Sequence, residues 1–127
     1  YSEQIYDRQD EVLSTVESPQ YNWDAIHEGM RLVLNDPMND TNYLNFYDCA
    51  VTVAGKTGTA QKGEGIKNDG LFICYAPYED PEIAVAVVVE RGHAGASVGF
   101  IARQIIDVYL NIRSYSNTSE SEMSLLK

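Results

Sequence analysis

The chain is poor in basic residues, in cysteine and in long hydrophobic runs. Its 127 residues include 9 Lys and Arg against 19 Asp and Glu, for a formal net charge of -10 at pH 7. This negative charge repels nucleic-acid phosphates and anionic lipid surfaces, so we expect no nucleic-acid partner. The longest hydrophobic run, Ile83 to Val89, is far shorter than the roughly 20 residues of a membrane-spanning helix. We therefore expect a soluble segment that folds as one domain.

The two cysteines and two histidines are too few for a disulfide framework or a convincing zinc site. Cys49 and Cys74 have no recognised ligand spacing to His27 or His93. If a hairpin turns near Gly65, Cys74 pairs near Thr57 while Cys49 faces a position well beyond Pro77, so the two sulfurs are too far apart to bridge. We predict two free thiols, no metal and no cofactor, with structural or solvent roles for both histidines.

Apolar residues at three- and four-residue steps predict two amphipathic helices. The first covers about 23–35, with Asn22 as its N-cap. It ends at a predicted loop over 37–48, where Pro, Asn and Asp favour turns. The second covers about 97–112, with Ser97 as its N-cap. Both helices are expected to cover a sheet.

Three runs rich in β-branched and apolar residues predict antiparallel strands at about 49–61, 70–76 and 83–90. The turn residues Asn68–Gly70 join the first two strands as a hairpin. The third run is continuous rather than alternating, which favours a strand covered on both faces at the centre of its sheet. The predicted fold class is therefore α+β, an antiparallel sheet with covering helices.

The two ends of the chain are more polar than its middle. Residues 1–18 carry only a short apolar patch, and they could form an extended edge element or an ordered connector. Residues 113–127 are rich in Ser and polar residues, so we assign them to a C-terminal tail. The domain portion is then 1–112.

The segment Ala54–Gln61, AGKTGTAQ, admits two enzymatic interpretations. In the first, Gly55, Lys56 and Thr57 end a phosphate-binding loop of the type G-x-x-x-x-G-K-[ST], which cradles phosphates at a helix N-terminus. The spacing argues against this loop, because its first glycine would fall at Ala50. The residues that follow also favour a hairpin rather than a helix.

In the second interpretation, Lys56, Thr57 and Gly58 are the Lys-Thr-Gly element of serine acyl-transferases that act on penicillin-like and D-Ala-D-Ala substrates. The context is more specific than the triplet. VAGKTGTAQ is followed by GLFICYAP, EIAVAVVVERG and the helix IARQIIDVYL. From about Gln20 to Leu110, the chain resembles the C-terminal part of the transpeptidase domain of class B penicillin-binding proteins.

This resemblance implies a partial penicillin-binding transpeptidase fold, of the serine DD-transpeptidase and β-lactamase-like superfamily. It implies that Lys56, Thr57, Gly58 and Thr59 bind substrate, and that Lys56 and the Thr59 backbone N–H, an oxyanion-hole donor, are catalytic. Lys56 supplies charge, the threonines supply hydroxyls, and Gly58 lets a peptide backbone approach. Strict alternation puts Lys56 and the threonines on opposite faces, so they must meet around a sheet edge. The resemblance implies that edge.

The family's nucleophile is missing from this segment. Its Ser-x-x-Lys and Ser-x-Asn motifs lie upstream of Lys-Thr-Gly, and neither precedes Lys56 here. Ser124–Lys127 matches the first motif but follows the strand. Tyr43–Asn45 matches a Tyr-x-Asn variant of the second but lies too close to Lys56. We interpret both as chance matches and expect the isolated chain to be inactive.

The resemblance further implies a parent protein that cross-links peptidoglycan stem peptides through an acyl-serine intermediate. The parent would be anchored at the extracytoplasmic face of the bacterial membrane by a helix outside this chain, with a role in the cell wall and cell shape. Its partners would be D-Ala-D-Ala stem peptides, β-lactams and the rest of the transpeptidase domain. The alternative is a non-catalytic peptide-binding or structural domain of the same fold.

The third strand is expected to promote self-association of the chain. In the resembled family its far edge pairs with strands that this chain lacks, so here the edge would be bare. We expect dimerisation or swapping through that edge, unless the segment Glu3–Val16 folds over it.

Overall fold

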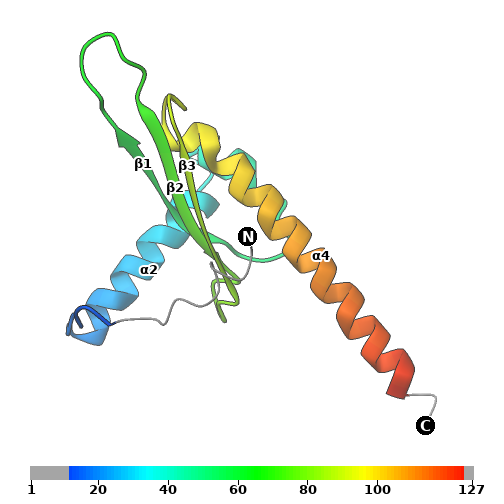
Figure 1. Ribbon diagram of the computed structural model, residues 1–127. Coiled ribbons are helices and arrows are strands. Elements are labelled where there is room, and N and C mark those ends of the chain that lie inside the picture. The colour runs from blue at the N-terminus through cyan, green and yellow to red at the C-terminus, as the bar shows by residue number, and fades with distance from the viewer. Residues whose placement is uncertain (1–11, 125–127) are drawn as a thin grey trace.

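The computed structural model describes residues 12–124. Its elements are, in chain order, α2 (Gln20–Asn35), α3 (Asp40–Phe46), β1 (Ala54–Ala60), β2 (Asp69–Ala76), β3 (Ile83–Val89), the short 3-10 helix η1 (Gly95–Val98) and α4 (Gly99–Ser124). The strands form one antiparallel sheet in the order β1-β2-β3 (Figure 1). The predicted α+β class, with helices beside an antiparallel sheet, is confirmed.

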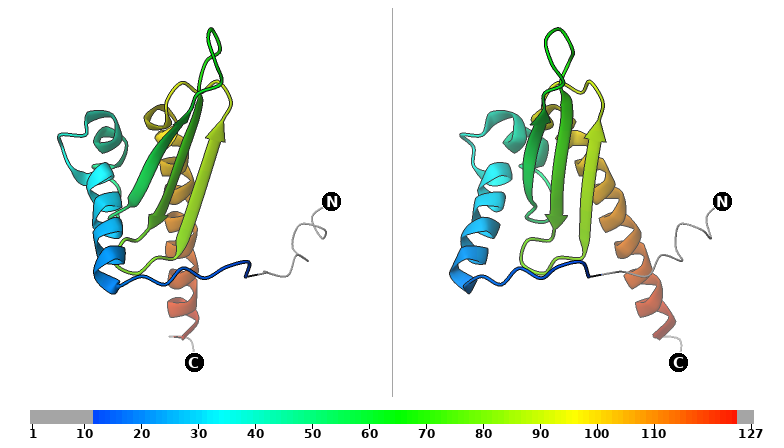
Figure 2. Two further views of the ribbon diagram at one scale, coloured as in Figure 1. Left: turned by 90° about the vertical axis from the view of Figure 1, so that its left-hand side faces the viewer. Right: turned by 60° about the vertical axis from the view of Figure 1, so that its left-hand side comes forward.

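The helices pack on different parts of the sheet. α2 packs against β1 and α3, whereas α4 packs against β2 and β3 (Figure 2). At the centre of the core, the rings of Phe46 and Phe72 stack with centroids 5.7 Å apart. Leu34 from α2 and Ile106 from α4 are fully buried in the same cluster. Each such side chain contributes about 1.5 to 3 kcal/mol by leaving water, so this cluster fixes the helices relative to the strands.

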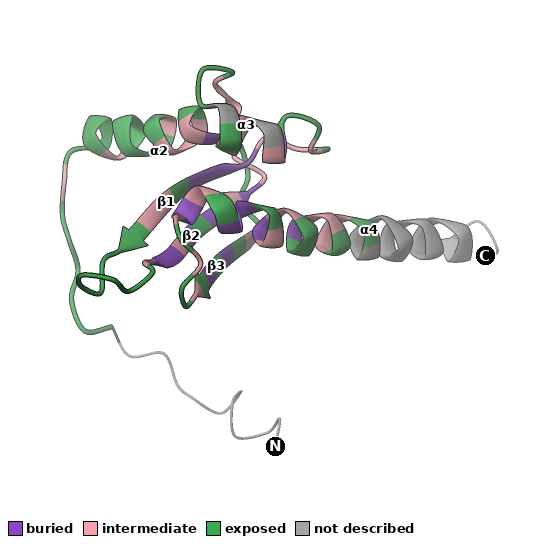
Figure 3. Cartoon of the chain, turned by 90° about the horizontal axis from the view of Figure 1, so that it is seen from above, coloured by how far each residue is buried: buried purple, intermediate pink, exposed green. Residues whose placement is uncertain are grey.

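The sheet has one covered face and one open face, because side chains alternate along each strand. On β2, Phe72 is 1% exposed while its neighbour Ile73 is 52% exposed. Ile73 lies opposite Lys56 on β1 and Ala86 on β3, so these three residues share the open face. In the view from above, buried positions recur between more exposed ones along β2 and β3 (Figure 3). The Lys-Thr-Gly strand therefore borders an uncovered apolar surface.

The first helix begins earlier than its apolar period indicated. α2 starts at Gln20, and Pro19 occupies the N-cap position with a φ of -52°. The prediction of Asn22 as N-cap is wrong: it lies in the first turn, and its Nδ2 donates to Ser18 Oγ at 2.9 Å. Proline favours a helix start because its φ is already set near the helical value.

The predicted loop over 37–48 contains the seven-residue helix α3, so this expectation is corrected. A helix this short is marginal alone and needs tertiary contacts. Phe46 supplies them, because its buried ring packs on Phe72. Beyond α3 the Cys49 N–H donates to Phe46 O at 3.0 Å, and β1 begins only at Ala54.

The C-terminal helix extends past its predicted end at 112. α4 reaches Ser124, and neither Gly nor Pro interrupts the sequence over 113–124. Ser97 is not an N-cap, since it lies inside η1 and its N–H donates to Ala94 O at 3.0 Å. The assignment of 113–127 to a tail stays a prediction. No helix within the described range is both long enough and apolar enough to cross a bilayer.

β3 lies at the edge of the sheet formed by residues 12–124, and the central strand is β2. The prediction of a central, doubly covered third strand is therefore wrong for this part of the chain. Val85 and Val87 are buried, while Ala86 and Val88 are exposed, Val88 at 67%. A continuous apolar run hides this alternation, because hydropathy does not distinguish an alanine facing solvent from one facing the core. Most of the segment Glu3–Val16 lies outside the described residues, so coverage of the edge by that segment stays a prediction.

Candidate functional site

β1 is an edge strand of the described sheet, and the backbone groups of Thr57 and Thr59 face its free edge. In an antiparallel pair, the N–H and C=O of one residue point to the same neighbour, and successive residues alternate. The Ala76 carbonyl accepts a 2.9 Å bond from the turn leading into β3, so Ala76 points toward β3. By alternation the backbone N–H and C=O of Ile73 point toward β1, where Ile73 pairs with Lys56. The backbone N–H and C=O groups of Thr57 and Thr59 therefore point away from β2.

Lys56 brings a positive charge to this same edge. Its side chain starts on the open face, yet Nζ donates to the carbonyl oxygen of Thr57 at 2.8 Å. The Lys56 side chain thus reaches the strand edge at the Thr57 backbone, although alternation places the Thr57 side chain on the opposite face. Among the side chains that the structure describes, which lie within residues 12–111, no carboxylate forms an ion pair with Lys56. The ammonium group is available to an anion.

On the covered face, η1 contacts the far end of β1. The Gly95 N–H donates to Thr59 Oγ1 at 3.4 Å. A Cβ on Gly95 would lie only 2.6 Å from Gly58 N and would also collide with the carbonyl oxygens of Gly58 and Leu71. Only glycine, which has no Cβ, fits at position 95 against the backbone of Gly58 and Leu71. No local signal in the sequence reveals this role of Gly95, because its contacts lie on distant strands.

The base of the β1–β2 hairpin is held by Asp69. Its Oδ2 lies 2.8 Å from Lys62 Nζ, and its Oδ1 accepts the Arg91 N–H at 2.9 Å. The hydrogen bond from Lys62, followed by that from the Arg91 backbone, lowers the pKa of Asp69 below its ordinary value. The prediction of Asp69 as a turn residue is wrong, because it is the first residue of β2 and pairs with Ala60. No local signal reveals its bond to the loop after β3.

The other sequence motifs do not join this site. Tyr43–Asn45 lies on α3, which packs against α2, α4 and η1. There the Asn45 Nδ2 donates to Thr41 O at 3.0 Å. Ser124–Lys127 lies outside the described residues except for Ser124 at the end of α4. β1 continues into a hairpin rather than a helix, which rules out the phosphate-binding loop.

The cysteines and histidines also lie apart from Lys56. Cys49 and Cys74 are both free, and burial raises the pKa of Cys74 to about 11. The ring of His27 meets Tyr75 edge-on at 5.9 Å, whereas His93 adopts a positive φ of 68° in the loop after β3. The described residues contain no group of three or more His, Cys, Asp or Glu side chains suited to a metal.

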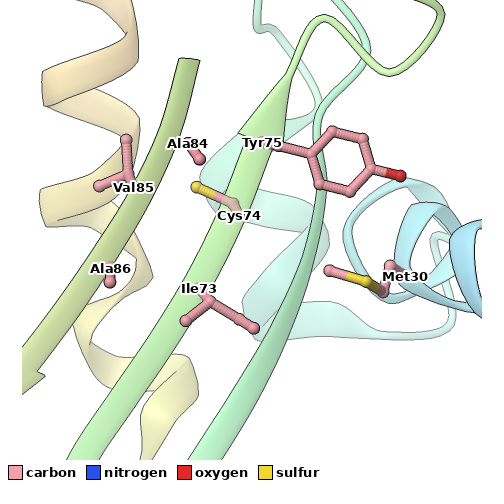
Figure 4. A pocket seen from close by; sticks show the side chains of 7 residues that line it. All are labelled: Met30, Ile73, Cys74, Tyr75, Ala84, Val85 and Ala86. Atoms are coloured by element: carbon pink, nitrogen blue, oxygen red, sulfur yellow. The ribbon is translucent and has the colours of Figure 1, made fainter. Parts of the chain in front are cut away.

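The open face carries an apolar pocket of about 280 Å³ (Figure 4). Met30 of α2 points toward Ile73 and Tyr75 of β2, and Ala84 and Ala86 of β3 complete the wall. No charged side chain lines it. The pocket therefore suits apolar groups and not the carboxylate of a peptide.

Comparisons with known proteins agree on one family. The penicillin binding protein transpeptidase domain model matches residues 2–107. The peptidoglycan D,D-transpeptidase MrdA of Escherichia coli strain K12 is 34% identical over 99 residues, which cover 67% of this chain and 16% of that protein. The MrdA of Haemophilus influenzae is 37% identical over 106 residues, covering 72% of this chain and 16% of that protein.

Among solved structures, Pseudomonas aeruginosa PBP2 in complex with WCK 5153 superposes with a TM-score of 0.68 at 32% identity. The match covers 81% of this chain and 23% of that one, so this chain spans only a small part of the relatives it matches. The family match, the shared fold and the Lys-Thr-Gly edge strand lead to one conclusion: the chain belongs to the penicillin-binding protein transpeptidase family, as part of a class B domain of the PBP2/MrdA type.

Proposed function

We propose that this segment supplies the substrate-binding edge strand of a peptidoglycan DD-transpeptidase. The observation that carries the proposal is the meeting of Lys56 Nζ with the Thr57 carbonyl on the free edge of β1. Next along that edge, the backbone of Thr59 also points outward. A cation beside outward N–H and C=O groups suits an extended peptide that ends in a carboxylate.

A stem peptide ending in D-Ala-D-Ala would pair along the free edge of β1. Lys56, with the hydroxyls of Thr57 and Thr59, would hold the terminal carboxylate. The Thr59 N–H would then donate to the oxygen that becomes negative when the peptide carbonyl is attacked. Gly58 carries no side chain to obstruct the approach on the open face.

The attacking serine must come from outside this chain. Its Oγ would bond to the carbonyl carbon of the penultimate D-Ala, and the C–N bond to the terminal D-Ala would break. The serine proton would end on the leaving amine. An amine of a neighbouring stem peptide would then take the acyl group, forming the cross-link and restoring the serine. β-Lactams would acylate the same serine.

The rest of the parent protein would cover the apolar pocket of the open face and the outer edge of β3, and would leave the free edge of β1 accessible to substrate. The apolar pocket beside Ile73 and the exposed Val88 are surfaces that water solvates poorly. Function in the cell wall would place the parent at the extracytoplasmic face of the membrane, anchored outside this segment. Alone, this chain would not react with substrate.

The test is the mass of the intact parent protein before and after incubation with benzylpenicillin. The expected result is a single covalent adduct on the parent and none on the isolated chain. The Lys56→Ala parent serves as the matched variant and should form the adduct far more slowly. A folded parent that gains no mass would contradict the proposal and favour a non-catalytic peptide-binding domain.

A further inference from the structure

The loop between β3 and η1 contacts the proposed substrate strand from its covered side. Resting on the function proposed above, we propose that Gly95 is a positioning residue for Thr59. Gly95 touches no substrate in this proposal. It acts by setting the place of the β1 backbone and the direction of the Thr59 hydroxyl.

Gly95 packs directly against backbone atoms of the sheet. Gly58 and Leu71 are paired and direct their side-chain positions to the open face, which leaves a gap on the covered face. Gly95 fills that gap so closely that a Cβ would lie 2.6 Å from Gly58 N. Gly70 extends this close contact, because a Cβ there would lie 3.0 Å from Ala94 O. Backbone atoms cannot rotate away as side chains do, so any side chain at position 95 must move either η1 or β1.

The hydrogen bond from Gly95 restricts the Thr59 hydroxyl. Gly95 N–H donates to Thr59 Oγ1 at 3.4 Å, which occupies one acceptor position of that oxygen. A hydroxyl that accepts in this way keeps its own hydrogen for a second partner. Because Thr59 is exposed, that hydrogen is free to point toward a ligand carboxylate. Gly95 thereby orients a donor without touching the ligand.

Asp69 anchors the other end of the loop. It accepts the Arg91 N–H at 2.9 Å and pairs with Lys62 at 2.8 Å. Close by, the His93 N–H donates to Asn68 O at 3.1 Å. Asp69 lies opposite Ala60, the residue after Thr59. The loop over 91–95 is thus bonded to the hairpin at both ends, and its position determines that of Gly95.

The main test uses Gly95→Ala in the intact parent, with Gly29→Ala as the matched control. A Cβ at Gly29, on the exposed side of α2, would meet nothing within 4 Å. Acylation by a fluorescent penicillin is resolved into a binding constant and an acylation rate, beside the melting temperature. We expect Gly95→Ala to slow acylation about 10- to 100-fold, and Gly29→Ala to react at the parent rate.

A pair of Asp69 variants tests the anchor if Gly95→Ala does not fold. Asp69→Asn keeps an oxygen that can accept the Arg91 N–H but loses the charge that pairs with Lys62. Asp69→Ala loses both interactions. If the loop position matters, Asp69→Ala slows acylation while Asp69→Asn retains most of the rate.

The outcomes separate this inference from the proposed function. A folded Gly95→Ala or Asp69→Ala parent that is acylated at the unaltered rate would overturn the positioning role, even with a lower melting temperature. Equal loss in Asp69→Asn and Asp69→Ala would also count against it, because it would assign the effect to charge. If the unaltered parent forms no adduct, the proposed function itself fails.

Discussion

Lys56 Nζ lies 2.8 Å from the carbonyl oxygen of Thr57, the next residue on β1. This bond turns the lysine from the open face of the sheet to its free edge. The backbone N–H and C=O groups of Thr57 and Thr59 point to the same edge. The Lys56 ammonium group and these hydrogen-bonding groups therefore lie side by side along the free edge of β1. This geometry lets a strand with strictly alternating side chains present a single binding surface.

Removal of the Lys56 ammonium should abolish most of the reactivity of the parent. We expect Lys56→Ala to slow penicillin acylation by about 100-fold or more, because a charge-assisted bond to the ligand is lost. Lys67→Ala, in the exposed hairpin loop, is the matched control and should react normally. Gel fluorescence over time measures both. Equal rates for the two variants would remove Lys56 from the site.

Substitution of Thr59 by proline should separate catalysis from folding. The Thr59 N–H points away from β2, so the sheet loses no hydrogen bond, and edge strands tolerate proline. We expect Thr59→Pro to fold but to acylate about 100- to 1000-fold more slowly. Thr59→Val, which keeps the N–H, should lose less. If the two variants behave alike, the hydroxyl rather than the N–H is the important group.

Arg103 should contribute measurably to the stability of the fold. It bonds Asn45 O at 3.1 Å and Asp107 Oδ1 at 2.8 Å, and it pairs with Asp48 at 2.6 Å. Burial opposes its charge, but the bonds to Asp107 and Asp48 outweigh it and raise the pKa of Arg103. We expect Arg103→Met to lower the free energy of unfolding, measured in urea, by about 1 to 3 kcal/mol. Gln104→Met, exposed on the same helix, should cost far less.

The two thiols should differ in reactivity. Cys74 is 3% exposed and its pKa is raised to about 11 by burial, whereas Cys49 is only partly buried. With a disulfide reagent at pH 8 the native chain should react first at Cys49, and Cys74 should become reactive only toward pH 11. Cys49→Ser and Cys74→Ser assign the two phases. Under denaturing, non-reducing conditions we expect two thiols per chain, and a count below two would show that they are bridged.

The outer edge of β3 should promote self-association of the isolated chain. Within residues 12–124 no strand pairs with that edge, and Val88 is 67% exposed. An unpaired apolar edge adds strands from other chains, and a lysine there discourages this. Light scattering should show dimers or larger species that Val88→Lys reduces and Gln61→Lys does not. A monomer at all concentrations would contradict the expectation.

Local features of the sequence determined the hairpin and the candidate site. β-Branched residues and the triplet at Lys56 act over a few positions, so they can be recognised without a fold. Helical periodicity located α2 and α4 for the same reason, although their ends differ. The turn was predicted too late, because Asp69 and Gly70 belong to β2 and pair with Ala60 and Thr59. The alternation of Lys56 with Thr57 already required a sheet edge if they were to share a site.

Only the tertiary structure decided which elements lie next to one another. Burial of Phe46 on Phe72 stabilises a helix where turn residues predicted a loop. The apolar run of β3 could not show that one of its sides faces solvent. Gly95 reaches Thr59 across 36 residues, and Asp69 reaches Arg91 across 22. Such contacts depend on the register and packing of the whole sheet, and therefore no local pattern encodes them.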